Sequence, residues 1–167
     1  MRNLIRGLAP AVMIAGIAVA SFAATASARP SGRCEESLLA AKMSVIHGSS
    51  GAGHIEYRLT VKNHGPTCAV HEHPGLILLG SGGAHLPTHV SDQGHGGIVA
   101  IRPGETVSSK LRFSPDIAGP GEPSHGACEP AAHHVKVILT QSISVVGPVE
   151  PPTSVCGHGA ITEEPLS

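Results

Sequence analysis

The chain has 167 residues and carries 11 Lys and Arg against 12 Asp and Glu, which gives a formal net charge of −1 at pH 7 with its histidines neutral. That balance leaves no basic surface to neutralise a phosphate backbone, so no nucleic-acid partner is expected. Aromatic residues make up only 2% of the chain. This argues against a stacking platform for bases or sugar rings, because such platforms depend on exposed aromatic faces.

Residues 1–28 have the pattern of a cleaved export signal. Arg2 and Arg6 supply a positive start, an apolar run follows, and the sequence ASA at residues 26–28 is a small-residue cleavage motif. A membrane anchor is the alternative, but the apolar run is short and rich in Ala and Gly for a spanning helix. We therefore expect a single mature domain over residues 29–167, located outside the cell, secreted or held at the cell wall, with no membrane span after cleavage.

Alternating apolar and polar residues predict a series of short strands. Residues 38–46 form the first, and HIEYRLTVKN at residues 54–63 is the clearest, because its apolar and polar residues fall on opposite faces. A strand and a turn follow in GLILLGSGGAHLP, and two strands around a Pro-Gly turn follow in GGIVAIRPGETVSSKLRFSP. Another strand is predicted in HHVKVILTQ. The last short strands are expected in SISVVGP and GAITEEP. The residues expected to face inward are Ile55, Tyr57, Leu59, Val61, Val107, Ser109, Leu111, Phe113, Val135, Val137 and Leu139.

The number and spacing of these strands indicate the fold class. Seven or eight short strands with Pro- and Gly-rich turns between them predict an all-β, antiparallel sandwich. Long loops are expected at about residues 80–96, 114–132 and 147–157. No mature segment has a sustained helical period, although residues 34–43 are compatible with one turn of helix.

Four cysteines remain in the mature chain, namely Cys34, Cys68, Cys128 and Cys156. An even number in an exported protein favours disulfides over thiolate metal ligands. We favour Cys34–Cys68 and Cys128–Cys156, because each pair closes a loop of about 30 residues and would stabilise the fold by about 3 kcal/mol. Spacing alone leaves the other two pairings open.

The order of these motifs resembles a known family. It consists of a first cysteine, the strand GSSGAGHIEYRLTVKNHG, the segment CAVHEHPGLILL, the turn and strand IRPGETVSSKLRFS, a third cysteine before HHVKVILTQ and a fourth in VCGHGAI. The chain is similar over residues 34–165 to the secreted domain-of-unknown-function family numbered 4232 of high-GC Gram-positive bacteria. Where that family has Gly-Tyr before its first Pro-Gly turn, this chain has Glu72-His73. The resemblance implies an immunoglobulin-like fold, export and no assigned activity.

Twelve histidines make metal binding the main chemical alternative. His71 and His73 are two residues apart, so on an extended strand their imidazoles would point to the same side, which suits Zn²⁺ or Cu²⁺. Pro74 follows at once and can end that strand. The loop HLPTHVSDQGH could complete the ligand set with His85 and His89, or with Asp92 or His95. Scattered surface histidines and a charge response below about pH 6 are the competing interpretations.

No pattern in the sequence indicates an enzyme. It has no Gly-x-Ser-x-Gly, Ser-x-x-Lys, His-Glu-x-x-His or Cys-x-x-Cys motif. The adjacent pairs Glu35-Glu36 and Glu163-Glu164 are interpreted as solvated surface. We therefore predict a non-catalytic binding module, monomeric, without a cofactor, and with an unknown envelope or extracellular partner. The alternative is an extracytoplasmic Zn²⁺- or Cu²⁺-binding protein using His71, His73, His85 and His89.

Overall fold

Strands dominate the computed structural model, which describes residues 32–167. The predicted signal peptide, residues 1–28, lies outside the described residues. The elements are η1 (Glu36–Leu38), β1 (Leu39–Val45), β2 (Ile55–Asn63), β3 (Cys68–His71), β4 (Gly75–Leu79), β5 (His89–Asp92), β6 (Ile98–Ile101), β7 (Thr106–Phe113), β8 (Ala132–Thr140), β9 (Ile143–Thr153), α1 (Cys156–Gly159) and β10 (Ala160–Glu163). The predicted all-β class is confirmed, with ten strands in the described part of the chain rather than seven or eight.

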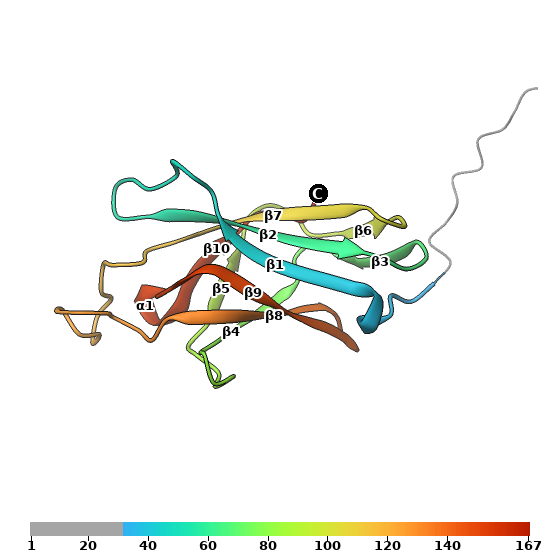
Figure 1. Ribbon diagram of the computed structural model, residues 1–167. Helices are drawn as coiled ribbons and strands as arrows, with labels where there is room; N and C mark the ends of the chain where they lie inside the picture. Colours follow the sequence, from blue (N-terminus) through green and yellow to red (C-terminus); the bar gives the residue numbers. More distant parts are fainter. Residues whose placement is uncertain (1–31) are drawn as a thin grey trace, which may run out of the picture.

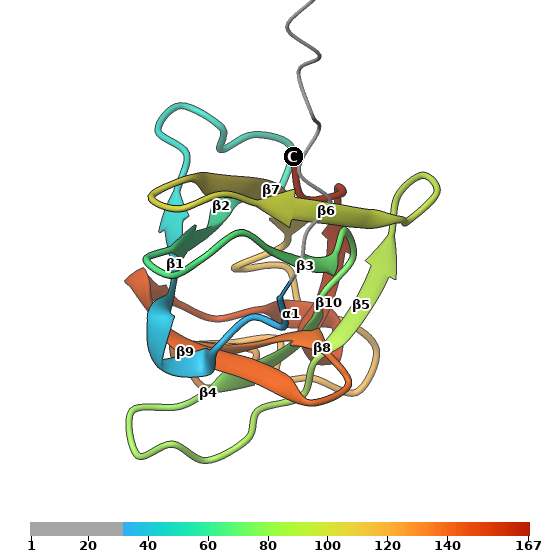
Figure 2. The same ribbon diagram turned by 90° about the vertical axis from the view of Figure 1, so that its right-hand side faces the viewer.

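The strands form two facing layers. Hydrogen bonds connect eight of them in the order β4-β8-β9-β1-β2-β7-β10-β5, and β3 pairs with β6 separately. In Figure 1, β1, β2 and β7 lie above β4, β8 and β9. Figure 2 shows β1 along one side of the molecule and β5 and β10 along the other. Among the ten strands of residues 32–167, all pairings are antiparallel except β1 with β9 and β10 with β5.

The period-two pattern of β2 and β7 places their apolar side chains in the core between these layers. Tyr57 on β2 pairs with Leu111 on β7, and both are at most 1% exposed. The Tyr57 ring lies 5.2 Å from that of Phe113, and its hydroxyl donates to the Pro151 carbonyl at 3.0 Å. All predicted inward positions are buried except Ile55, which is partly buried. The predicted strand faces are therefore confirmed.

Gly147 allows β9 to approach β1 closely while it stays paired with β8. A Cβ at this position would lie 2.0 Å from the Ala41 carbonyl oxygen on β1. Beyond this point, β9 pairs with β1 through Met43 with Val149 and Ser44 with Glu150. The close approach therefore lets one strand belong to both layers.

Gly147→Ala is expected to destabilise the protein by about 2 kcal/mol or more, because the added methyl group meets backbone that cannot rotate away. Urea unfolding followed by far-ultraviolet circular dichroism measures this loss. Gly82→Ala is the matched control, since a Cβ there meets no atom within 4 Å. Equal stability of the two variants would contradict the role assigned to Gly147.

Two predicted loops contain strand structure. β5 lies inside the loop expected at residues 80–96, and β9 continues to Thr153 into the loop expected at residues 147–157. The strand β5 is short and at an edge, and its residues are largely exposed, so it carries little apolar alternation. The Pro residues in the second half of β9 are typical of loops, so the continuation of this strand was not predicted. The helical turn allowed at residues 34–43 is the short 3₁₀ helix η1, followed at once by β1.

Both predicted disulfides are confirmed. Cys34–Cys68 has a Cα–Cα distance of 5.0 Å and ties the segment before η1 to β3. Cys128–Cys156 has a Cα–Cα distance of 5.5 Å and ties the long loop before β8 to α1. Each bridge therefore anchors a segment with little strand pairing of its own.

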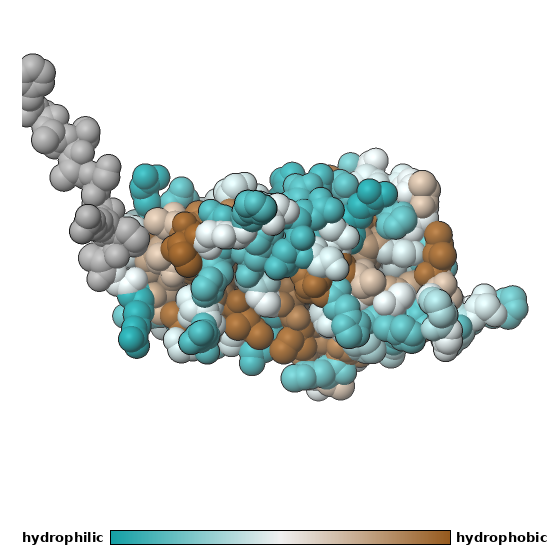
Figure 3. Space-filling view, turned by 180° about the vertical axis from the view of Figure 1, so that it is seen from behind, coloured by the Kyte–Doolittle hydropathy of each residue, from teal (hydrophilic) through white to brown (hydrophobic). Residues whose placement is uncertain are grey.

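The surface is mixed in character. Figure 3 shows apolar side chains gathering along the lower part of the back face, while hydrophilic ones cover much of the upper part. Among residues 32–167, the most exposed large apolar side chains are Ile98, Ile117 and Val146. They belong to three different segments. Within the described part of the chain, no helix is both long enough and apolar enough to cross a bilayer.

Candidate functional site

The four histidines predicted as metal ligands lie in different places. His71 ends β3, His89 begins β5, and His85 lies in the loop between β4 and β5; all three are exposed. His73 is in the turn before β4 and is largely buried, with its side chain 9% exposed. Within residues 32–167, His73 alone of the four belongs to a group of side chains close enough to share a metal ion, and its companions there are Asp92 and Glu163.

Glu163 is the largest departure from the sequence interpretation. It was expected on a solvated surface, but the whole residue is 0% exposed. Burial, followed by the nearby negative charge of Asp92, raises the pKa of its carboxyl group to about 8. The cause lies in the strand register, because Ile161 and Glu163 share the inward face of β10. That alternation was readable in the sequence GAITEEP and was missed there.

The outer face of β10 borders a charged groove with a cavity volume of about 470 Å³. Residues of β2, β5, β7 and β10 line it, together with the loop after β7 and part of α1. Alternation explains the polar lining, because the outward residues Lys110 and Arg112 on β7 alternate with the buried Leu111 and Phe113. The groove is of the size that small-molecule sites occupy.

The two cations of the groove differ in their ion pairs. The Lys110 ammonium group lies 2.7 Å from a Glu164 carboxylate oxygen and 3.7 Å from one of Glu56. The hydrogen bond to Glu164 and the charges of Glu164 and Glu56 raise the pKa of Lys110. Arg112 is exposed and lies between Glu56 and Thr162 in register, yet it makes no ion pair within residues 32–167. Its guanidinium group is therefore available to an anionic ligand.

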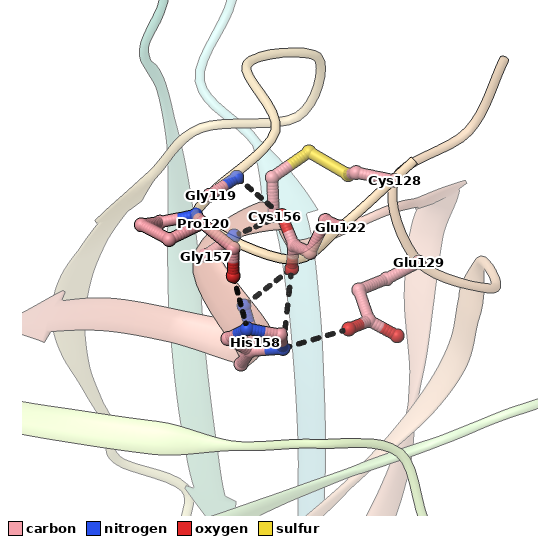
Figure 4. Close-up of polar contacts among 8 residues, drawn as sticks. All are labelled: Gly119, Pro120, Glu122, Cys128, Glu129, Cys156, Gly157 and His158. Atoms are coloured by element: carbon pink, nitrogen blue, oxygen red, sulfur yellow. Dashed lines mark hydrogen bonds and ion pairs between the residues drawn. A yellow bond between two sulfur atoms is a disulfide. The ribbon is translucent and has the colours of Figure 1, made fainter. Parts of the chain in front are cut away.

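A second polar cluster centres on Glu122 in the long loop (Figure 4). Its carboxylate accepts the backbone N–H groups of His158 at 2.5 Å, Gly119 at 2.5 Å and Gly157 at 2.9 Å. These bonds lower the pKa of Glu122 to about 2. Its side chain is 1% exposed. Positive φ angles at Gly157 and His158 turn two successive N–H groups toward the carboxylate.

The Glu122 cluster has an evident structural role. The His158 ring lies 3.7 Å from a Glu122 oxygen and 3.6 Å from one of Glu129, and its Nε2 lies 3.0 Å from the Pro120 carbonyl oxygen. The cluster joins the loop before β8 to α1 beside the Cys128–Cys156 bridge (Figure 4). Because the carboxylate already has three donors, it serves to hold the loop.

Comparison with known proteins gives one result. A family model described as a domain of unknown function (DUF4232) matches residues 34–165. The chain belongs to this family. No curated protein and no solved structure matches it. The family membership expected from the order of cysteines and Pro-Gly turns is thus confirmed, while the immunoglobulin-like detail and the bacterial source stay expectations. The DUF4232 description names no activity, so the function of this member has to be argued from its sites.

Proposed function

We propose that the protein is a non-catalytic, extracytoplasmic binding module that holds an acidic ligand in the charged groove. The two disulfides support a location in an oxidising compartment. The single observation that carries the ligand class is the exposed Arg112 without an ion pair, inside a concave surface beside Lys110. A guanidinium group presents a planar set of N–H donors that matches carboxylate and phosphate groups.

The remaining lining limits the ligand further. Glu56 and Glu164 are engaged with Lys110, so they reduce the local positive charge without occupying Arg112. A ligand with one acidic group and several hydroxyl groups fits this mixture better than a polyanion, because the two carboxylates would repel additional negative charge. Hydroxyl partners are available on Ser91, Ser114 and Thr162, which line the same groove.

Calorimetric titration with glucuronate, glycerol 3-phosphate and glucose tests this function. We expect the two acidic probes to bind more tightly than glucose, and the stronger of the two to identify a carboxylate or a phosphate ligand. Arg112→Ala should weaken that binding by at least about tenfold, the loss expected for a charge-assisted hydrogen-bonded pair.

Arg102→Ala is the matched control, because it removes the same charge from an exposed position outside the groove, where Arg102 faces Glu105 at 3.8 Å. It should leave affinity unchanged. Binding of both acids no tighter than that of glucose, or an equal loss in the two variants, would refute the groove as the ligand site.

A further inference from the structure

Three side chains from three separate segments converge on the inner side of β10. His73 lies in the turn before β4, Asp92 ends β5 and Glu163 ends β10. One nitrogen of the imidazole and one oxygen of each carboxylate all lie within 4.8 Å of one another. Asp92 and Glu163 are partners in the parallel β5–β10 register, so their side chains leave the sheet on the same side.

The buried members of this cluster lack hydrogen-bond partners. Within residues 32–167, both carboxylate oxygens of Glu163 and both ring nitrogens of His73 are buried without a hydrogen bond. Burial and a nearby negative charge raise the pKa of the Glu163 carboxyl group, and Ser109 is close enough to lower it, but the Ser109 hydroxyl donates to the Glu164 carbonyl instead. The His73 side chain is 9% exposed and Glu163 is 0% exposed. Buried polar groups are nearly always satisfied, because an unsatisfied one keeps its full desolvation cost. The imidazole of His73 and the carboxyl group of Glu163 therefore point to a ligand that both of them bind.

We propose that His73, Asp92 and Glu163 form a Zn²⁺ site. The separations suit an ion better than direct contacts, since His73 Nδ1 lies 3.9 Å from Asp92 Oδ1, too far for a hydrogen bond. Ligand atoms each about 2.0–2.1 Å from a tetrahedral Zn²⁺ lie about 3.4 Å from one another. Because every separation in the cluster is at most 4.8 Å, the ligand atoms would have to approach one another by up to about 1.4 Å to hold the ion.

The donor set selects among divalent metals. Ca²⁺ and Mg²⁺ prefer oxygen ligands, whereas one of the three ligands in this cluster is an imidazole, which suits Zn²⁺. Three protein ligands with water in a fourth position are the arrangement of Zn²⁺ in catalytic sites, whereas structural Zn²⁺ has four protein ligands, so Zn²⁺ held here would add a reactive metal centre to the proposed binding module. The fourth position would face solvent beside Asp92, whose side chain is 54% exposed.

The surrounding backbone holds the cluster in place. A Cβ at Gly96 would lie 2.6 Å from His73 Cδ2, so the loop after β5 covers the imidazole and requires glycine there. The neighbouring Glu72 fixes this loop, since its N–H donates to the Gly97 carbonyl at 3.0 Å and its carboxylate accepts the Gly97 N–H at 2.8 Å. The Gln93 N–H donates to the Glu163 carbonyl at 2.7 Å. These contacts fix the backbone segments that carry the ligands, while the buried ligand side chains themselves have no hydrogen-bond partner within residues 32–167.

This site is separate from the charged groove. Glu163 points inward from β10, and the next residue, Glu164, points outward into the groove. Loss of acidic-ligand binding and loss of Zn²⁺ binding can therefore be measured independently. The proposal also replaces most of the ligand set predicted from sequence, because it retains His73 and omits His71, His85 and His89.

Titration of the tag-free, disulfide-bonded, EDTA-treated protein with ZnCl₂ in a calorimeter tests the site. We expect one Zn²⁺ per chain and a rise in the midpoint of thermal unfolding, because an ion that binds only the folded state stabilises it. Glu163→Gln, which preserves side-chain volume, should weaken binding by more than the roughly 10–100-fold lost when an outer-shell partner of a metal site is removed. X-ray absorption at the zinc edge should show only nitrogen and oxygen ligands, since the four cysteines are in disulfides.

Two further variants keep the test decisive. Asp92→Asn alters an exposed side chain, so it should weaken Zn²⁺ binding even if Glu163→Gln fails to fold. The control His71→Ala/His85→Ala removes two exposed histidines and should leave affinity and stoichiometry unchanged. Absence of a one-to-one complex in the wild type, equal affinity in Asp92→Asn, or loss of binding in the histidine control would overturn the proposal.

Discussion

Replacing Cys34 and Cys68 together by alanine is expected to lower the free energy of unfolding by about 3–4 kcal/mol. The bridge joins residues 34 apart in sequence, and an open loop of that length gains this much conformational freedom in the unfolded chain. The loss is large against the roughly 5–15 kcal/mol that stabilises a typical domain. Guanidinium unfolding of the oxidised wild type and the variant, followed by far-ultraviolet circular dichroism, measures it.

The second bridge supplies the comparison. Cys128→Ala/Cys156→Ala opens a loop of similar length, with a sequence separation of 28, so the entropic loss should be nearly equal. Its variant should lose more in total, because Cys128 and Cys156 also hold the two segments that meet at Glu122. A loss below about 1 kcal/mol in the Cys34 and Cys68 variant would contradict a structural role for that bridge.

The sequence predicted the parts of the fold that alternate cleanly. The strands β2, β7 and β8 pack one face against the core, so their apolar residues recur at every second position and their inward faces were correctly assigned. The strand β5 has no such pattern because it is a short edge strand with mostly exposed residues. An edge strand of this kind forms because a neighbouring strand pairs with it, and its partner β10 is about 70 residues away in sequence. Its own residues therefore did not predict it.

The positions of Glu163 and Arg112 could both be predicted from the inward and outward alternation of side chains along a strand, if residue type is ignored. Each position follows from the register of its strand, inward for Glu163 and outward for Arg112. Because glutamate is usually exposed, Glu163 was assigned to the surface from the sequence, although its place in the strand pointed inward. A carboxylate at an inward position, next to apolar residues, is the kind of local conflict that marks a functional site.

No local sequence pattern shows which distant side chains meet in the folded protein. His73, Asp92 and Glu163 come from three segments that meet only because β5 and β10 pair in parallel and the turn before β4 lies against them. The pair His71 and His73 looked like two ligands on one strand, but β3 ends at His71 and the chain then turns. The following residue, Pro74, was the sequence signal against a shared face.

Glu122 gave no sequence signal at all, because its role depends on backbone N–H groups rather than on side chains. Gly157 and His158, the donors on α1, lie 35 and 36 residues further along the chain. Their positive φ angles were not foreseen, and His158 is a residue type for which such angles are uncommon. The cluster is therefore a feature that only the folded structure reveals.

Glu122→Gln is expected to destabilise the protein at neutral pH and to have little effect in strong acid. The ionised carboxylate is stabilised by three N–H donors, which lower its pKa from 4.5 to about 2. A group whose pKa falls on folding contributes stability above its unfolded pKa and loses that contribution as pH drops through the folded value. The wild-type advantage should therefore be constant above about pH 5 and should shrink between pH 4.5 and about 2.

Urea midpoints measured for both proteins across that pH range test the assignment, and Glu129→Gln is the matched control. Glu129 carries the same charge and also faces the His158 ring, at 3.6 Å. If the backbone donors dominate, Glu129→Gln should shift the midpoint far less, since within residues 32–167 the carboxylate of Glu129 has only the His158 ring as a partner. Equal shifts in the two variants would instead assign the effect to the charge of His158. A wild-type advantage that persists to pH 2 would show that Glu122 acts through packing rather than through its ionised carboxylate.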